Sequence, residues 1–107
     1  MLRSVEQKRQ GPVTSGGEDP RVTELRSAVS RLRRELAAHP GRFADRSIAE
    51  EELAALDAMA AGGAPEIMRL RRSLLLVAGA IGSVSALAPG VSRVRDAVNL
   101  FGEPPRG

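Results

Sequence analysis

The segment from residue 65 to residue 88 constrains the fold most, because its last fifteen residues carry no charge. Apolar residues recur in it at alternating spacings of three and four, which is the spacing of one helical face. They are Leu70, Leu74, Val77, Ile81, Val84 and Ala88. A helix that is uncharged on every side needs neighbours all round it. We therefore expect residues 65–88 to form the central helix of a small bundle.

A strip of small residues lies along one side of this expected helix: Ala78, Gly82, Ser85 and Ala86. Small side chains let a neighbouring helix come close to the backbone. The sequence thus predicts a tight helix–helix contact at Gly82.

Two amphipathic helices are predicted before the uncharged segment. The first covers residues 20–38, where Asp19 supplies a side-chain acceptor at the cap position and precedes a proline. The second covers residues 48–61, where Ser47 and Glu50 have the spacing of a capping box. Both segments repeat apolar residues with helical spacing, so each is expected to bury one face.

A short fourth helix is predicted at residues 90–101, because Pro89 interrupts the helical pattern before it. The predicted fold class is therefore all-α, a small bundle of three or four helices within residues 20–102. Phe43 stands in the loop between the first two helices. We expect its ring to cover one end of the bundle.

The two ends of the chain differ from the predicted bundle in composition. Residues 1–19 mix glycine and proline with polar residues and show no sustained apolar period, so we expect a disordered leader. Residues 103–107 are expected to form a frayed tail. The remaining residues make one small domain, and domains of that size often gain stability by burying a face against a second copy.

The charges are divided along the chain. Residues 47–66 sum to minus five and contain no basic residue, whereas residues 20–46 and 67–107 each sum to plus four. Opposite charges of this kind favour contact between neighbouring antiparallel helices. Six arginines form a candidate basic patch: Arg31, Arg33, Arg34, Arg69, Arg71 and Arg72. The last three oppose the dipole of their own helix, so we expect them beside the C-terminal end of the second helix or beside acidic groups of another chain.

No group of residues matches a known chemical site. The chain has no cysteine and one histidine, His39, which stands where a helix is expected to end, and a zinc site needs more ligands than this. Glu50, Glu51 and Glu52 are consecutive in an expected helix, so their side chains splay apart and do not converge on a metal or a substrate. We therefore predict no catalytic site, no cofactor, no metal and no small-molecule substrate, and hence no enzyme.

Two alternatives to a protein-binding function stay open. A basic nucleic-acid-binding protein would use the arginines, but the chain has no Tyr or Trp to stack on bases and no known reading motif. A membrane-active protein would use residues 74–88, although fifteen helical residues reach only about 22 Å and a bilayer core needs about 30 Å. The first residues show no secretory signal, and the lack of cysteine fits a reducing compartment, so we expect a cytoplasmic protein.

Three passages carry a family resemblance: LRRELAAHP, IAEEELAALDAMAAGGAPE and LRRSLLLVAGAIGSVSALAPGVSRVRDAVNLFG. With them the chain resembles short uncharacterised actinobacterial proteins of a domain-of-unknown-function family. The resemblance covers residues 22–102. It implies a small all-α domain and assigns no activity to any residue.

We interpret the chain as a helical interaction or self-association domain that binds itself or another protein. Its candidate interaction surface comprises nine apolar residues of the first and fourth helices: Val22, Leu25, Val29, Leu32, Leu36, Val91, Val94, Val98 and Phe101. A homodimer through one of these helices is expected. An exposed apolar patch on the folded domain would favour a protein partner. An uncovered helix over residues 65–88 would favour a membrane, and arginines gathered on one face would favour nucleic acid.

Overall fold

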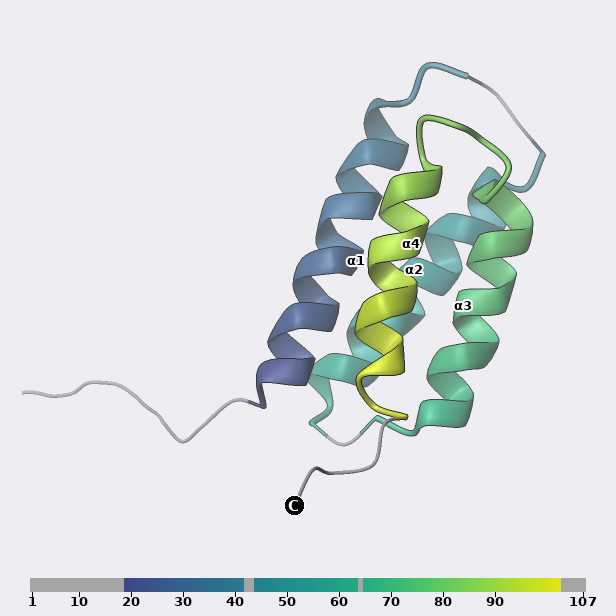
Figure 1. The fold of residues 1–107 in the computed structure, drawn as a ribbon. Coiled ribbons are helices and arrows are strands. Elements are labelled where there is room, and N and C mark those ends of the chain that lie inside the picture. The colour runs from purple at the N-terminus through teal and green to yellow at the C-terminus, as the bar shows by residue number, and fades with distance from the viewer. Residues whose placement is uncertain (1–18, 42–43, 64, 103–107) are drawn as a thin grey trace, which may run out of the picture.

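Four helices form an antiparallel bundle in the computed structural model, which describes residues 19–41, 44–63 and 65–102 (Figure 1). They are α1 (Pro20–Ala38), α2 (Arg46–Ala61), α3 (Ile67–Ile81) and α4 (Ala88–Asn99). Each helix packs against two others, in the order α1, α2, α3, α4 and back to α1, so α1 and α3 lie at opposite corners. Within the described ranges the chain forms no strand, and the predicted all-α bundle is confirmed in its four-helix form.

The core of the bundle is built from one apolar stripe of each helix. The buried residues of α1 have the predicted spacing and are Val22, Leu25, Val29, Leu32 and Leu36. At the opposite corner, α3 buries Leu70, Ser73, Leu74, Val77 and Ile81. A fully buried leucine or valine stabilises the fold by about 1.5–3 kcal/mol. Short helices are marginal alone, so these stripes are what holds the four helices in place.

α1 begins as the sequence predicts. Asp19 is the cap residue and its Oδ1 accepts a hydrogen bond from the Arg21 backbone N–H at 2.9 Å, with Pro20 in the first turn. The Arg21 guanidinium also donates to Asp19 Oδ2 at 2.7 Å. These bonds to Arg21, the side-chain bond first, lower the pKa of the Asp19 carboxyl group.

The start of α2 differs from the prediction. The helix begins at Arg46, so Ser47 lies inside it, and the cap residue Asp45 makes no side-chain cap hydrogen bond. The capping box expected from Ser47 and Glu50 is therefore wrong. Glu50 instead pairs with Arg46, with 3.5 Å between Oε2 and Nε. With Asp45 at the cap, the third helical position is Ile48, so Glu50 does not stand where a capping box needs its acidic residue.

Arg46 joins the end of α1 to the start of α2. Its guanidinium donates to the carbonyl oxygens of Gly41 at 3.1 Å and His39 at 3.3 Å, and also to that of Leu36. The last carbonyl groups of a helix have no N–H partner further along the helix. The guanidinium of Arg46 therefore donates hydrogen bonds to carbonyl oxygens at the C-terminal end of α1. His39 ends α1 where the sequence predicts, and its Nδ1 accepts a hydrogen bond from the Gly41 N–H at 3.1 Å.

The uncharged segment does not form one helix, and the expectation of a central helix over residues 65–88 is wrong. α3 ends at Ile81, and residues 82–87 form turns that lead into α4. Leu87, at the end of this connection, is 1% exposed and fixes it to the core. α3 itself occupies a corner of the bundle and has neighbours only in α2 and α4.

The residues after Ile81 explain why the helix stops. Gly82, Ser83 and Ser85 favour turns over helix. Pro89 has no N–H to donate to a continuing helix. It lies instead in the first turn of α4, where no such bond is needed. α4 consequently begins and ends two residues earlier than predicted.

The close helix contact lies elsewhere than expected. The atoms nearest to a Cβ atom on Gly82 would be backbone atoms of Ala78, near the end of α3. The first turn of α4 makes the tight contact instead, at Gly90. A Cβ atom there would stand 2.6 Å from Glu35 Oε1 and 2.7 Å from Leu32 Cδ1 of α1. A side chain at this position would force Glu35 and Leu32 to shift, so glycine suits this close approach of α4 to α1.

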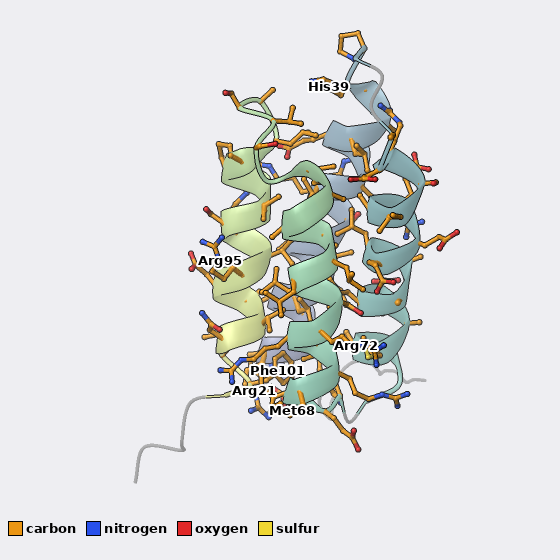
Figure 2. The ribbon with its side chains drawn as sticks, turned by 90° about the vertical axis from the view of Figure 1, so that its right-hand side faces the viewer. Arg21, His39, Met68, Arg72, Arg95 and Phe101 are labelled. Atoms are coloured by element: carbon orange, nitrogen blue, oxygen red, sulfur yellow. The ribbon has the colours of Figure 1, made fainter. Side chains whose placement is uncertain are left out.

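The turn after α4 lies at the lower end of the bundle, where Figure 2 shows Arg21, Met68 and Phe101. The Phe101 ring centroid lies 4.9 Å from Arg21 Cζ, a cation–π contact with the start of α1. Gly102 lies against the start of α3, since a Cβ atom on it would stand 2.6 Å from Arg71 Nη2. This turn therefore bridges the first turns of two helices at opposite corners of the bundle.

Three predicted features fall outside the described residues. They are the leader apart from Asp19, the tail of residues 103–107, and Phe43 with its expected place at one end of the bundle. The leader, the tail and the position of Phe43 stay predictions.

Candidate interaction surface

The apolar residues predicted to form the interaction surface lie inside the bundle. Eight of the nine are buried: Val22, Leu25, Val29, Leu32, Leu36, Val91, Val94 and Val98. Phe101 is half-buried beside Arg21. The ring of four helices explains this placement, because each helix has two neighbours and its stripe is covered within one chain. A partner could contact these side chains only if the bundle opened.

The arginines of the candidate basic patch do not gather on one face. Arg31, Arg33 and Arg34 lie in the second half of α1, towards the upper end of the bundle in Figure 1. Arg69, Arg71 and Arg72 lie in the first two turns of α3, at the lower end. Since α1 and α3 occupy opposite corners, the two arginine clusters differ both in side and in level.

Two ion pairs join α1 to its neighbouring helices, and a third lies within α1. Glu35 Oε2 lies 3.1 Å from Arg93 Nη2 of α4 and 3.4 Å from Arg31 Nε of its own helix. Arg26 Nε lies 3.1 Å from Asp57 Oδ1 of α2. The attraction expected between the acidic second helix and its basic neighbours is thus realised in the pair of Arg26 and Asp57.

The arginines of α3 are placed differently. Within the described parts of the chain, Arg69, Arg71 and Arg72 form no ion pair. Arg69 lies beside Ala58 and Gly62 at the C-terminal end of α2, one of the two places that the sequence suggested. The negative end of the α2 dipole favours a cation there.

Four large apolar side chains are exposed on α2 and α3. Met68 and Leu75 are each 72% exposed, Leu76 is 43% exposed and Ile48 is 42% exposed. Met68, Arg72 and Leu75 are spaced by four and three residues and so share the outer side of α3. Figure 2 views the bundle towards this helix and labels Met68 and Arg72 on it. A single exposed apolar residue is common on protein surfaces, whereas several on adjacent helices form a patch that can bind a partner.

A shallow groove of about 440 Å³ runs between α2 and α3 beside Leu76. Its lining residues are Glu52, Ala55, Ala58, Met59, Arg69, Arg72, Ser73 and Leu76. Ile48 stands four residues before Glu52 and therefore lies on the same side of α2. We call the α2–α3 face the surface formed by Ile48, by Ala55 and Leu76 of the groove, and by Met68 and Leu75 on the adjoining outer side of α3.

Charged residues of opposite sign lie towards different ends of the α2–α3 face. Glu51 and Glu52 lie in the first two turns of α2, and Arg69 and Arg72 lie in the first two turns of α3. Because the two helices are antiparallel, α2 begins at the upper end and α3 at the lower end (Figure 1). We call the two glutamates the acidic end and the two arginines the basic end.

The comparison with known families covers this whole bundle. The model of a family of unknown function, DUF5955, matches residues 14–102, which include all four helices. The chain belongs to this family. No curated protein and no solved structure matches the chain. The predicted membership in a domain-of-unknown-function family is confirmed, and the actinobacterial source stays a prediction.

The DUF5955 domain has a second groove, between α1 and α4, with a volume of about 650 Å³. Its charged lining residues are Arg21, Glu24, Arg31, Arg93 and Asp96. Both signs of charge are interspersed along this groove, so it presents no single-sign field to an ionic ligand. The apolar side chains in it are small except for Leu100, which is 36% exposed. The α1–α4 groove therefore has fewer large exposed apolar side chains beside it than the α2–α3 face.

Two further properties of the DUF5955 domain bear on the alternatives. None of the helices within residues 19–41, 44–63 and 65–102 combines the length and the apolar character that crossing a bilayer requires. The same ranges hold no group of three or more His, Asp or Glu side chains placed to bind a metal ion.

Proposed function

We propose that this DUF5955 domain is a protein-interaction module that binds through the α2–α3 face and performs no catalysis of its own. The observation that carries the proposal is the 72% exposure of Met68 and of Leu75 on a bundle whose apolar stripes are otherwise buried. Burying a side chain of this size stabilises a complex by about 1.5–3 kcal/mol. A contact that covers both residues therefore has a substantial driving force.

The chemistry of the face suggests what a partner presents. The groove beside Leu76 accepts apolar side chains, as in other complexes in which a helix lies in an apolar groove. Arg69 and Arg72 offer donors that no acidic group of the described chain occupies. A partner with apolar anchors and a nearby carboxylate satisfies both features.

The same surface favours a protein over the two alternatives. The two arginine clusters lie at opposite corners, which does not suit a nucleic-acid backbone that follows one continuous basic stripe. An anionic membrane surface would attract Arg69 and Arg72 but repel Glu51 and Glu52 on the same face. We place the domain in the cytoplasm, where its partner would be a soluble or a membrane-associated protein.

Photo-crosslinking in the native host tests the proposal without presuming a partner. A photoreactive amino acid replaces Leu75 on the α2–α3 face in one strain. In the control strain it replaces Ser30, which is exposed on the polar side of α1. We expect a discrete protein adduct from position 75 and none from position 30.

Each outcome of the crosslinking decides something. A discrete adduct at position 75 supports the α2–α3 face as a protein-binding surface, and its mass tells a second copy from another protein. Absence of any protein adduct at position 75, or equal adducts at both positions, contradicts the proposal. Lipid adducts at position 75 would favour a membrane surface instead.

A further inference from the structure

We infer that the occupant of the α2–α3 face is a second copy of this chain, in a two-fold dimer. The two-fold axis lies in the interface and runs roughly perpendicular to the helices. The inference rests on the proposed function and identifies its partner. The order of charges along the face carries it.

The acidic end of the face has carboxylates without partners. Glu51 is exposed and Glu52 is half-buried in the lining of the groove. Neither forms an ion pair among the described residues. Glu50 differs from them because it pairs with Arg46 of its own helix. The negative charge available to a second molecule is therefore that of Glu51 and Glu52.

The basic end has the opposite character. Arg69 and Arg72 are exposed, line the same groove and form no ion pair among the described residues. Arg71 lies on another side of α3, close to Gly102. Glu66 stands just before α3 and offsets one of the two arginines, so this end keeps a net positive charge.

A two-fold rotation makes this charge order complementary to itself. When two copies meet face to face about an in-plane axis perpendicular to the helices, the upper end of each copy lies on the lower end of the other. Both acidic ends then meet basic ends at once, as a self-complementary interface requires. An axis parallel to the helices would instead place the two acidic ends at the same level of the dimer.

The same rotation covers the exposed apolar residues. Ala55 lies three residues after Glu52, and Leu75 and Leu76 lie three and four residues after Arg72, so these apolar residues are near the middle of the face. Ile48 lies towards the acidic end and Met68 towards the basic end, and the rotation brings each to the level of the other in the second copy. An apolar centre with two charged flanks is the usual arrangement of a protein interface.

Charge reversal tells a role in binding from a role in folding. If these residues only stabilised the fold, mixing two opposite variants would not restore a dimer. The acid-reversed variant carries E51R and E52R, and the base-reversed variant carries R69E and R72E. In each variant alone, both ends of the face have one sign and repel their copies. When the two variants are mixed, every basic end can meet an acidic end. We expect the wild-type chain to dimerise in the micromolar range and each variant alone to dimerise at least about tenfold more weakly.

Sedimentation velocity of the full chain measures this directly. Interference optics are needed, because the chain has neither Trp nor Tyr. We expect the equimolar mixture of the two variants to recover the dimer and the L75D variant to stay monomeric. Circular dichroism checks that each variant is folded. If a double variant is unfolded, the single variant E51R replaces the acid-reversed one and R72E replaces the base-reversed one.

A wild-type chain that stays monomeric across the micromolar range overturns the inference. So does a dimer that both charge-reversed variants preserve, or a mixture that dimerises no better than its components. These outcomes leave the proposed function testable on its own, because crosslinking at position 75 to a different protein would support the α2–α3 face and exclude the second copy.

Discussion

Leu32 of α1 and Gly90 of α4 lie so close that a Cβ atom on Gly90 would stand 2.7 Å from Leu32 Cδ1. Leu32 is fully buried and cannot turn away freely. We predict that G90A lowers the free energy of unfolding by about 1–2 kcal/mol through overpacking between the two helices. Urea unfolding followed by circular dichroism measures the change.

Gly79 of α3 provides the matched control for G90A. It is exposed inside a helix, and a Cβ atom on it would meet nothing within 4 Å. G79A should therefore raise the free energy of unfolding by about 0.5 kcal/mol, because alanine loses less backbone freedom than glycine in a helix. Equal effects of G79A and G90A would show that α4 does not approach α1 as closely as described.

The guanidinium of Arg46 is expected to stabilise the corner between α1 and α2. R46A removes donors from the carbonyls of Leu36, His39 and Gly41, and should cost about 1–2 kcal/mol in the free energy of unfolding. R46K keeps the charge but not the planar fork of donors, so it should fall between R46A and the wild type.

Arg34 is the control for this arginine effect. Its side chain is exposed and donates to Ser30 Oγ of the same helix at 2.9 Å. R34A should change the free energy of unfolding by less than about 0.5 kcal/mol. If R34A lowered the free energy of unfolding as much as R46A, the carbonyl contacts of Arg46 would not be the source of its stabilising effect.

Asp19 should make the stability of the domain depend on pH. Its bonds to Arg21 lower the pKa of the carboxyl group below 3.8 in the folded chain. The unfolded chain therefore binds the proton more readily, so the stabilisation is present above the unfolded pKa and is lost as the pH falls through the folded pKa. D19N keeps a cap acceptor but has no charge to lose.

Unfolding of the wild type and D19N between about pH 7 and about pH 2 checks this effect. At neutral pH the wild type should be the more stable of the two. The difference should shrink as the pH falls below about 4. A difference that is constant over the whole range would exclude the pair of Asp19 and Arg21 as its cause.

Leu74 and Leu75 are adjacent in the sequence but should respond oppositely to truncation. Leu74 is 8% exposed in the core and Leu75 is 72% exposed. L74A should lower the free energy of unfolding by about 2–4 kcal/mol, whereas L75A should change it by less than about 0.5 kcal/mol at concentrations where the chain is monomeric. Similar losses for both would place Leu75 in the core.

The helices that the sequence predicts well are those with local signals. Asp19 and the proline after it mark the start of α1, and a single apolar stripe fixes which side is buried. The end of α3 was missed because the uncharged pattern continues past Gly82. Whether a helix continues there depends on the turn residues and on where the next helix packs. The spacing of apolar residues alone predicts neither of these.

The α2–α3 face was missed for a related reason. Leu75 belongs to the same uncharged run as Leu74, and the run suggested a helix covered on all sides. In a ring of four helices α3 has only two neighbours, so the residues off its main stripe face outwards. The spacing of Met68 and Leu75, which does not match the stripe of Leu70 and Leu74, was the available signal.

Arg46 could not be recognised from spacing at all. Its partners are backbone carbonyls of the preceding helix and loop, and any residue type can present a carbonyl. Only the path of the chain between α1 and α2 brings the guanidinium to them.

Disulfide trapping tests the central claim, association through the α2–α3 face, most directly. The chain has no cysteine, so a single introduced cysteine can pair only with a second copy. In L75C the cysteine lies on the outer side of α3, whose two copies face each other in the proposed dimer, whereas in the control S30C it lies on α1, outside the proposed interface. Under mild oxidation at micromolar concentration, we expect L75C to form a covalent dimer much faster than S30C. Equal rates for L75C and S30C, or no dimer from L75C, would contradict association through the α2–α3 face.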